Sequence, residues 1–453
     1  MNYFIFFISI FLISLQLNAA VKLISPANES IIYGRNIPFI IRGCKTMPSS
    51  TMKINNQQKR NLWKKTNYKK QWNSFVNLEN NKNYSIQLNG KCKNKSFSFN
   101  LQVNTNFNYF NNSIDQLAFT FINNNKPNKL AWDWSPAIFL YGLAKYAHKS
   151  QYKTSFINYV HNYHNHFVKN DLPNLNWADR CPSALSGLEL LKSFNNKIAI
   201  PNIQKVINFL KTTKKNSLGS INHFGTNSWM ARIFPQSIWV DSLMMWAVLA
   251  VQFGDLTKDN DLLEFGLKQP LIFANKMRDL ETGLFFHAWN IKKNRPFPKR
   301  NTFWLRGNAW VLTALIEMID IISPNNLYYP KLVQLFQSLA QSALNYQQPN
   351  GMWDTLISSP GSAYEESSGT ALLAYAYHKG HRLNLLEKKF QDASINSYTA
   401  LTARLFLKGE NRIMGEISWL TMPYSKLGYK LIPRKKNLAF GVGSLLLLAS
   451  EMQ

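Results

Sequence analysis

Cysteine is scarce in this chain, with only three among 453 residues, at Cys44, Cys92 and Cys181. Their spacing is not that of a structural zinc site, and we expect no metal centre. Cys44 and Cys92 fall in one N-terminal module and are the natural disulfide pair if the protein is exported, whereas Cys181 is expected to be a lone buried thiol.

Acidic residues are also few, 24 against 52 lysines and arginines, which gives a formal net charge of +28. The lysines are scattered in runs such as "KTTKKNS" and "PRKKN", and no known nucleic-acid-binding motif accompanies them. The sequence therefore does not favour a nucleic-acid partner. Two interpretations remain open: a solvated basic surface, and an electrostatic field that attracts acidic substrates.

Long hydrophobic runs are almost absent. One opens the chain in "MNYFIFFISIFLISLQLNAA", where the apolar stretch is too short to cross a bilayer and small residues follow it. We predict that residues 1–20 are a secretory signal, with a buried N-terminal helix as the alternative. The mature protein is then expected in the periplasm or outside the cell, without a membrane span.

Two regions with different sequence patterns follow the predicted signal. Residues 21–110 contain short alternating apolar runs broken by turn residues, as in "VKLISPANESIIYGRNIPFIIRG", and an Asn-Gly turn in "NYSIQLNGKC". These patterns predict a small β-sandwich, immunoglobulin-like in architecture. It could be a structural appendage or a carbohydrate-binding or docking module. Residues 111–453 form the predicted catalytic domain.

Helical patterns dominate from about residue 130 onward. Apolar or amphipathic segments are expected near 135–149, 153–168, 183–194, 201–213, 240–254, 260–277, 307–323, 328–346, 366–379, 384–406 and 438–451. Strand signals are almost absent between them. This arrangement favours helical hairpins around an axis, an α/α toroid. A helical solenoid is the competing fold, but the sequence shows no repeat of fixed period.

Aromatic and polar residues gather at the junctions between these helices. The candidates are Trp132, Trp134, Asp179, Trp239, Asp241, His287, Trp304, Arg306, Trp310, Tyr364 and Glu366. Each has a structural explanation when taken alone, as a carboxylate at a helix N-terminus or as a core side chain. Several clusters at one topological position instead indicate a sugar site, because indole faces stack on sugar rings and fixed polar groups orient hydroxyls and a carboxylate.

Five segments carry a family resemblance. In order along the chain, "WVDSLMM", "ETGLFFHAWN", "FWLRGNAWVLTALIE", "YEESSGTALLAYA" and "AFGVGSLLLLASE" resemble the unsaturated glucuronyl and rhamnogalacturonyl hydrolases of glycoside hydrolase families 88 and 105. The resemblance spans about residues 130–453 and implies a mainly α fold, an (α/α)6 six-hairpin barrel. It also implies an exo-acting enzyme without a cofactor, which removes a 4,5-unsaturated uronic acid from the non-reducing end of oligosaccharides made by polysaccharide lyases.

The resemblance assigns roles to matching residues. Asp241 matches the catalytic acid/base and Asp179 the second carboxylate. His287, Trp304, Arg306 and Trp310 match the residues around the substrate, and Trp132 and Trp134 match the aromatic entrance of the barrel. Two departures are visible. Asn290 stands where many relatives have aspartate, and a histidine that several members carry upstream of the catalytic aspartate is not evident in "SWMARIFPQ".

The family reaction hydrates the C4=C5 double bond of the unsaturated sugar, which calls for a neutral acid at neutral pH. A free aspartic acid has a pKa of about 3.9. Trp239 and Asp179 are expected to raise the pKa of Asp241, by desolvation and by like-charge repulsion. Arg306 or His287 is expected to contact the substrate carboxylate or the attacking water.

Two other functions remain open from the sequence. One is a different α/α-toroid enzyme, a hydrolase or lyase of intact polysaccharide, which predicts an open cleft. The other is a non-catalytic glycan-binding protein, for which Asn290 is the best support. The aglycone sugar and the oligomeric state are likewise left open.

Overall fold

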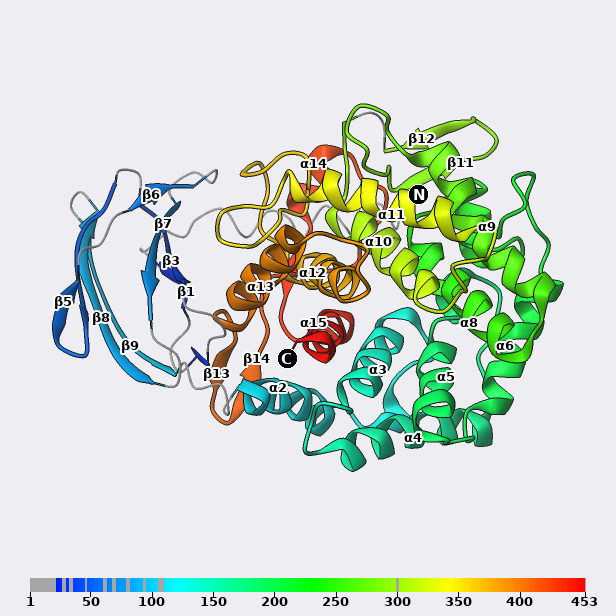
Figure 1. The fold of residues 1–453 in the computed structure, drawn as a ribbon, viewed down its shortest axis with the longest axis horizontal. Helices are drawn as coiled ribbons and strands as arrows, with labels where there is room; N and C mark the ends of the chain where they lie inside the picture. The colour runs from blue at the N-terminus through cyan, green and yellow to red at the C-terminus, as the bar shows by residue number, and fades with distance from the viewer. Residues whose placement is uncertain are drawn as a thin grey trace.

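A computed structural model describes most of the chain as an N-terminal β module followed by a larger helical domain (Figure 1). The described residues are 22–26, 30–31, 36–44, 47–59, 63–66, 71–78, 82–92, 95–104, 110–298 and 301–452. The predicted signal at residues 1–20 lies outside them.

The β module consists of two sheets, as the alternating pattern predicts. One sheet has the order β1 (Lys22–Ser25), β3 (Asn36–Arg42), β7 (Gln71–Asn77) and β6 (Lys64–Lys65). The other has the order β2 (Ser30–Ile31), β9 (Lys95–Asn104), β8 (Asn83–Cys92), β4 (Ser49–Ile54) and β5 (Gln57–Lys59). Alternate residues of β8, among them Tyr84, Ile86 and Leu88, are buried in the core of the module. This side-chain alternation is what the period of a half-buried strand requires.

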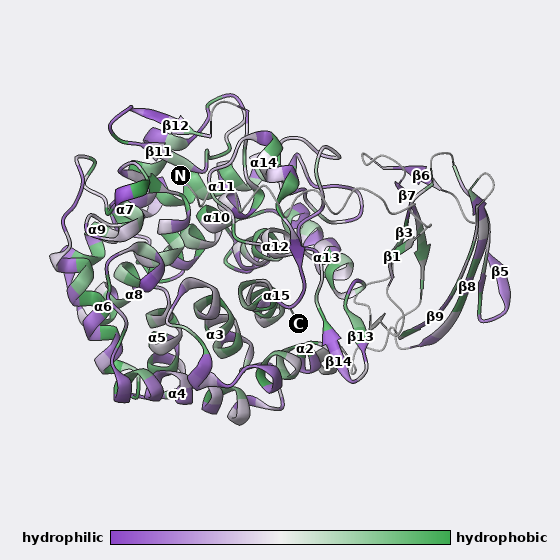
Figure 2. Ribbon diagram, turned by 180° about the vertical axis from the view of Figure 1, so that it is seen from behind, coloured by the Kyte–Doolittle hydropathy of each residue, from purple (hydrophilic) through white to green (hydrophobic). Residues whose placement is uncertain are grey.

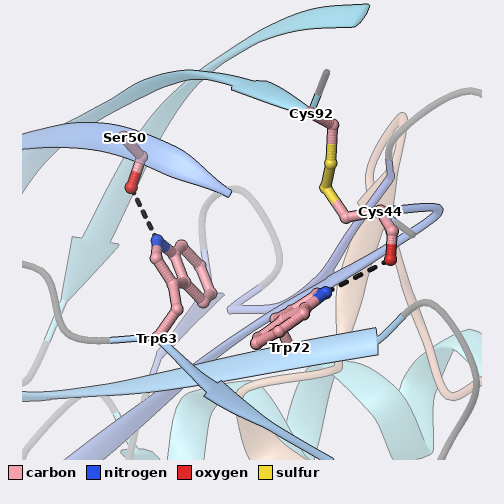
Figure 3. The surroundings of a disulfide bond; sticks show 5 residues. All are labelled: Cys44, Ser50, Trp63, Trp72 and Cys92. Carbon is pink, nitrogen blue, oxygen red and sulfur yellow. Dashed lines mark hydrogen bonds between the residues drawn. A yellow bond between two sulfur atoms is a disulfide. The ribbon is translucent and has the colours of Figure 1, made fainter. Parts of the chain in front are cut away.

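A disulfide closes one end of the module. Cys44, just after β3, is bonded to Cys92 at the end of β8, and their Cα atoms lie 5.4 Å apart (Figure 3). The indole of Trp72 donates a hydrogen bond to the Cys44 carbonyl (3.2 Å), and that of Trp63 to the Ser50 hydroxyl (2.6 Å). Both indoles belong to the module core or pack against it. They therefore serve the packing of the module rather than an exposed sugar-binding row.

The helical domain is a barrel of six hairpins, as the family resemblance implies. Among the described residues the inner ring is α3 (Trp134–Tyr146), α5 (Ser183–Phe194), α8 (Val248–Thr257), α10 (Leu305–Ile319), α12 (Ser367–Arg382) and α15 (Ala439–Glu451), and α15 packs back on α3 (Figure 1). The outer layer is α2 (Phe110–Asn124), α4 (Lys153–Asn170), α6 (Ile200–Thr212), α9 (Asn260–Met277), α11 (Tyr329–Leu344) and α13 (Lys388–Thr402). Each outer helix packs on the inner ring, and α4 contacts both α3 and α5.

The inner helices are apolar on nearly all sides because they are enclosed by neighbours. Figure 2 shows α15 as largely hydrophobic, whereas outer helices such as α4 carry hydrophilic stretches. The contact that closes the ring depends on two glycines. A Cβ at Gly142 of α3 would lie 2.3 Å from the carbonyl oxygen of Gly443 of α15, so neither position has room for a side chain.

The expected helix at 240–254 is confirmed, although it contains a short π-helix (Leu243–Ala247) before α8 and follows closely on strand β10 (Ser237–Trp239). Helix α2 was not predicted, and it supplies the outer partner of α15. Its buried residues Ile114, Leu117, Ala118 and Phe121 do follow helical spacing, but asparagines surround them.

Short strands that the sequence did not reveal join the helices. Strand β10 pairs with β11 (Ala288–Asn290), which pairs with β12 (Arg295–Phe297). Two antiparallel strand pairs, β13 (Phe406–Lys408) with β14 (Asn411–Ile413) and β15 (Ile417–Ser418) with β16 (Arg434–Lys435), precede α15. Helix α7 (Trp229–Ile233) precedes β10, and α14 (Lys426–Leu431) lies between β15 and β16. No described helix meets the length and hydropathy that a bilayer crossing requires.

Candidate active site

The predicted carboxylates meet in a cavity of about 290 Å³, formed by turns and helix starts of the barrel. Five predicted residues line it: Trp134, Asp179, Asp241, Trp304 and Arg306. Sequence analysis missed other lining residues, among them His223, Phe224 and Leu420. A cavity of this size is at the low end for a ligand pocket and suits a single sugar ring better than a polymer chain.

Asp241 is placed by the small three-stranded sheet. Trp239 of β10 pairs with Ala288 of β11, and the backbone N–H of Val240 donates to the carbonyl of His287 (3.0 Å). The side chains of Asp241 and His287 therefore lie side by side. Nε2 of His287 is 3.3 Å from Oδ2 of Asp241, although the contact lacks hydrogen-bond alignment and neither atom has another partner among the described residues.

His287 is itself fixed from two sides. Its Nδ1 lies 2.6 Å from the hydroxyl of Tyr429, which comes from α14. The Trp304 ring stacks on the imidazole with ring centroids 4.3 Å apart and an angle of 25° between the planes. Both His287 and Tyr429 are buried. Sequence reasoning missed Tyr429, whose segment shows no motif.

Asp179 lies on a single turn of 3-10 helix, Ala178–Arg180. Trp132 and Arg180 clamp this turn to the start of α3: the indole donates to the Arg180 carbonyl (2.8 Å), and the guanidinium donates to the Trp132 carbonyl (2.6 Å). The same guanidinium pairs with Asp133 at 3.2 Å. Trp132 is only 1% exposed, so it supports the turn from behind while Trp134 lines the cavity.

A histidine does lie upstream of Asp241 in the site, contrary to the reading of "SWMARIFPQ". It is His223, five residues before that segment. Its ring stacks on Trp239 with centroids 4.3 Å apart, Nδ1 contacts the Ser242 hydroxyl at 3.1 Å, and Nε2 lies 3.7 Å from Oδ1 of Asp179. The histidine in "INHFG" was the available signal, although it lies 18 residues before Asp241 in the sequence.

The two carboxyls have opposite environments. Burial and the charges of Asp133 and Asp241 raise the pKa of Asp179 well above its usual value, against the effect of Arg180. Burial also acts to raise the pKa of Asp241, but the contact with His287 and the charges of protonated His287 and His223 outweigh it and lower that pKa. The expected raised pKa of Asp241 is therefore wrong, and the raised pKa belongs to Asp179.

The histidines are neutral at neutral pH. Burial lowers the pKa of His223 to about 4, against the effect of the Asp241 charge. Burial likewise lowers the pKa of His287, although its contact with Asp241 and the charge there act in the other direction. Burial acts in the same direction on both carboxyls. The difference between the pKa values of Asp179 and Asp241 is therefore set by the neighbouring carboxylates and imidazoles.

Arg306 ties the cavity to the segment after β15. One guanidinium nitrogen donates to the Ser418 carbonyl (3.0 Å) and the Ser368 hydroxyl (3.1 Å), and the other donates to the Trp419 carbonyl (3.1 Å) and the Thr421 hydroxyl (2.9 Å). Only Nε remains without a partner among the described residues. Arg306 therefore has one buried N–H left for a ligand.

Three other predicted residues are buried and do not line this cavity. Glu366 caps α12, accepting from the N–H groups of Ser368 and Gly369, and lies 3.5 Å from Arg306. Tyr364 contacts the Ser418 hydroxyl at 2.8 Å. Trp310 lies in the barrel core. The first two hold the surroundings of Arg306 in place.

The mouth of the cavity is apolar. Trp229 of α7 is 60% exposed and packs edge-on to Trp177 (ring centroids 6.3 Å apart), and Leu420 is 53% exposed on the opposite segment. Solvent-exposed indoles beside a polar cavity are typical of sugar-binding sites, because they offer apolar faces to rings that extend outward.

Comparisons with known proteins agree with this geometry. The model of glycosyl hydrolase family 88 matches residues 110–453. The unsaturated rhamnogalacturonyl hydrolase YesR of Bacillus subtilis is 20% identical over 330 residues, 71% of this chain and 90% of that protein. The unsaturated 3S-rhamnoglycuronyl hydrolase of an Alteromonas species is 25% identical over 218 residues, 47% of this chain and 50% of that protein. A possible family 105 member from Salmonella enterica has a similar fold, with a TM-score of 0.67 at 20% identity over 75% of this chain and 92% of that one.

Proposed function

The chain belongs to glycosyl hydrolase family 88 and is a glycoside hydrolase, and from this premise we propose that it removes a 4,5-unsaturated uronic acid from the non-reducing end of lyase-generated oligosaccharides. The observation that carries the proposal is the pairing of Asp179 and Asp241 in one small indole-walled cavity, with their pKa values moved in opposite directions. Such separation of two carboxyls is how a site holds an acid and a base at one pH.

We propose that the two carboxyls hold one proton between them at neutral pH. In the free site this proton is on Asp179, and Asp241 is ionised. The substrate is itself an anion, so its binding raises the pKa of Asp241 by like-charge repulsion and desolvation. The proton then becomes available to Asp241, which faces the double bond in this proposal.

The chemistry is a hydration. Asp241 gives its proton to C4, a water oxygen forms a bond to C5, and the water's proton passes to the Asp241 carboxylate. The product is a hemiketal at C5, which opens to a ketone. The anomeric carbon then releases the aglycone as an alcohol and becomes an aldehyde. Protons are conserved in these steps, and the carboxyl pair ends with the single proton it began with.

The remaining residues have supporting roles in this proposal. The stacked pairs of Trp304 with His287 and of Trp239 with His223 form rigid walls that exclude water and fix the two imidazoles. Arg306 offers its Nε–H and a positive charge to the substrate carboxylate. The strongly basic surface, at a net charge of +28, favours the approach of anionic saccharides.

The alternatives receive less support. A hydrolase or lyase of intact polysaccharide needs an open cleft, whereas the carboxyls lie in a cavity of about 290 Å³. The non-catalytic reading relied on Asn290. This side chain is buried in β11 and accepts a hydrogen bond from the Lys293 backbone N–H (2.9 Å), so it stabilises a turn outside the lining of the cavity.

The test is incubation with unsaturated fragments made by pectin lyases and by glycosaminoglycan lyases. The proposal expects the ultraviolet absorbance of the C4=C5 bond to disappear while mass spectrometry shows the release of one terminal uronate. Fragments with a saturated terminus are the control and should be left intact. Cleavage of intact polysaccharide, or persistence of the double bond in every fragment, would reject the proposal.

We also propose that the protein is exported, with residues 1–20 as its signal. The Cys44–Cys92 disulfide supports an oxidising compartment. Expression of the full chain in a bacterium, followed by fractionation and N-terminal sequencing, tests this. Recovery of the unprocessed chain in the cytoplasm alone would contradict it.

A further inference from the structure

Tyr429 is the one residue of α14 that is fully buried, and its hydroxyl faces the catalytic cavity's histidine rather than solvent. The oxygen is 2.6 Å from Nδ1 of His287. Burial raises the pKa of Tyr429 well above its usual value. The phenol is therefore protonated, and its hydrogen is free to point at Nδ1.

The other nitrogen of this imidazole faces a carboxylate. Nε2 of His287 lies 3.3 Å from Oδ2 of Asp241, and neither atom has another partner among the described residues. A neutral imidazole has one N–H and one lone pair. With the lone pair on Nε2, two electron-rich atoms would face each other in a buried place. With the hydrogen on Nε2, the positive end of the N–H dipole faces the carboxylate.

We propose that Tyr429 is a positioning residue, which donates its hydroxyl hydrogen to Nδ1 and so holds His287 in the tautomer that presents Nε2–H to Asp241. The hydroxyl acts through the imidazole and touches neither the carboxylate nor the substrate. It keeps Asp241 ionised in the free site, where the proposed reaction needs the single proton to rest on Asp179. This inference rests on the proposed function only for its kinetic consequence.

Tyr429 belongs to the segment of residues 418–431, which contacts the site although it lies far along the chain from His287 and Asp241. Its beginning, Ser418 to Thr421, is bound by Arg306, and its end holds His287 through Tyr429. The segment thus contacts the site at two buried points, Ser418 and Tyr429, while Leu420 and Met422 line the mouth. Its packing therefore sets the proton arrangement of the histidine as well as the shape of the entrance.

Tyr429→Phe removes the hydroxyl and keeps the ring. His287 is then free to move its hydrogen to Nδ1, which turns the Nε2 lone pair toward Asp241 and raises the pKa of that carboxyl. Because the proposed reaction needs a carboxyl pair with one proton, and Asp241 would take up the second proton at a higher pH in this variant, the acid limb of the activity profile should move to higher pH. The groups around Asp241 that also titrate or carry charge, His223, Asp179 and Arg306, are unchanged in this variant.

The expected result is a fall in kcat of about tenfold or more with little change in KM, since an orienting contact to a catalytic dyad is lost. Tyr377→Phe is the matched control. It also removes a buried tyrosine hydroxyl that donates one hydrogen bond, here to the Ala340 carbonyl (2.9 Å). A loss of packing alone should affect both variants alike, whereas only Tyr429→Phe should move the acid limb.

A second measurement needs neither substrate nor a variant. Nitrogen-15 NMR of the histidine-labelled protein reports the tautomer of His287, with a His287→Gln variant to assign its signal. The proposal expects Nε2–H in the wild type and a shift toward Nδ1–H in Tyr429→Phe. Nδ1–H in the wild type, an unchanged tautomer in the variant, or an unmoved acid limb would each overturn it. Inactivity of the wild type on unsaturated fragments would instead reject the proposed function.

Discussion

Asp179 and Asp241 line the same cavity, yet the pKa of the first is raised and that of the second is lowered. The difference follows from their neighbours. The charges of Asp133 and Asp241 raise the pKa of Asp179, whereas His287 and His223 lower the pKa of Asp241. One proton on such a pair is stable over a range of pH, which a single aspartate of ordinary pKa could not achieve.

Asp241→Asn should fold and lose activity. Asparagine has the same shape as aspartic acid but can neither give a proton to C4 nor accept one from water. We expect kcat to fall by about a thousandfold, within the usual contribution of a general acid or base. Loss of the double-bond absorbance measures the rate, and circular dichroism confirms the fold. Asp392→Asn, which removes an exposed carboxylate of α13, should keep wild-type activity.

The pH profile should be bell-shaped, with both limbs set by the pair. The raised pKa of Asp179 means that the proton is lost as pH rises through that value, so kcat/KM should fall on the alkaline side. On the acid side, Asp241 takes up a second proton below its lowered pKa, and His223 becomes charged near pH 4. Activity should fall there too.

Asp179→Asn tests the alkaline limb. The variant has no titratable proton at this position, so kcat should fall by about a hundredfold, and the remaining activity should lose the limb that Asp179 sets. A variant that keeps the alkaline limb in place would show that another group controls it.

The succession of helical segments with almost no strand signal predicted an α/α toroid, and the family resemblance implied its six hairpins. The sequence also predicted which carboxylates meet, through the family motifs around Asp179 and Asp241. It could not reveal α14 or Tyr429, since these depend on how a segment without motif folds back over the site. The strand that positions Asp241 is three residues long, and its pattern merges with the apolar helix that follows.

The shift in the pKa of Asp241 was predicted in the wrong direction for a similar reason. Indoles and a second carboxylate near Asp241 argue for a raised pKa, and burial does act that way. The prediction left out His223 and the exact place of His287. Only the folded chain brings both imidazoles near Asp241, where the contact with His287 and the charges of the two rings outweigh desolvation.

The disulfide of the β module should matter for that module and not for catalysis. Its loop spans 48 residues, for which the loss of loop entropy in the unfolded chain corresponds to about 4 kcal/mol. The double variant Cys44→Ser with Cys92→Ser should therefore unfold its module at lower denaturant, followed by tryptophan fluorescence of Trp63 and Trp72. Activity of the variant below that transition should equal that of the wild type. A proportional loss of activity would place the module in catalysis.

Arg306→Lys should loosen the segment after β15 while leaving both carboxyls in place. The guanidinium makes four hydrogen bonds at once, to Ser418, Ser368, Trp419 and Thr421, and an ammonium group cannot reach partners in two directions with this planar geometry. Buried bonds to a charged group are each worth about 1.5 to 3 kcal/mol, so we expect a loss of about 2 to 4 kcal/mol in the free energy of unfolding.

The kinetic signature of Arg306→Lys should be a higher KM, because the segment that lines the mouth and the N–H offered to the substrate carboxylate are both disturbed. Hydrogen exchange should increase in residues 418–431 before it increases in the inner helices. Arg382→Lys alters an exposed ion pair with Glu451 and should change stability by less than about 1 kcal/mol. If both variants behaved alike, the segment would be held by its own packing, and the four bonds of Arg306 would not be what positions it.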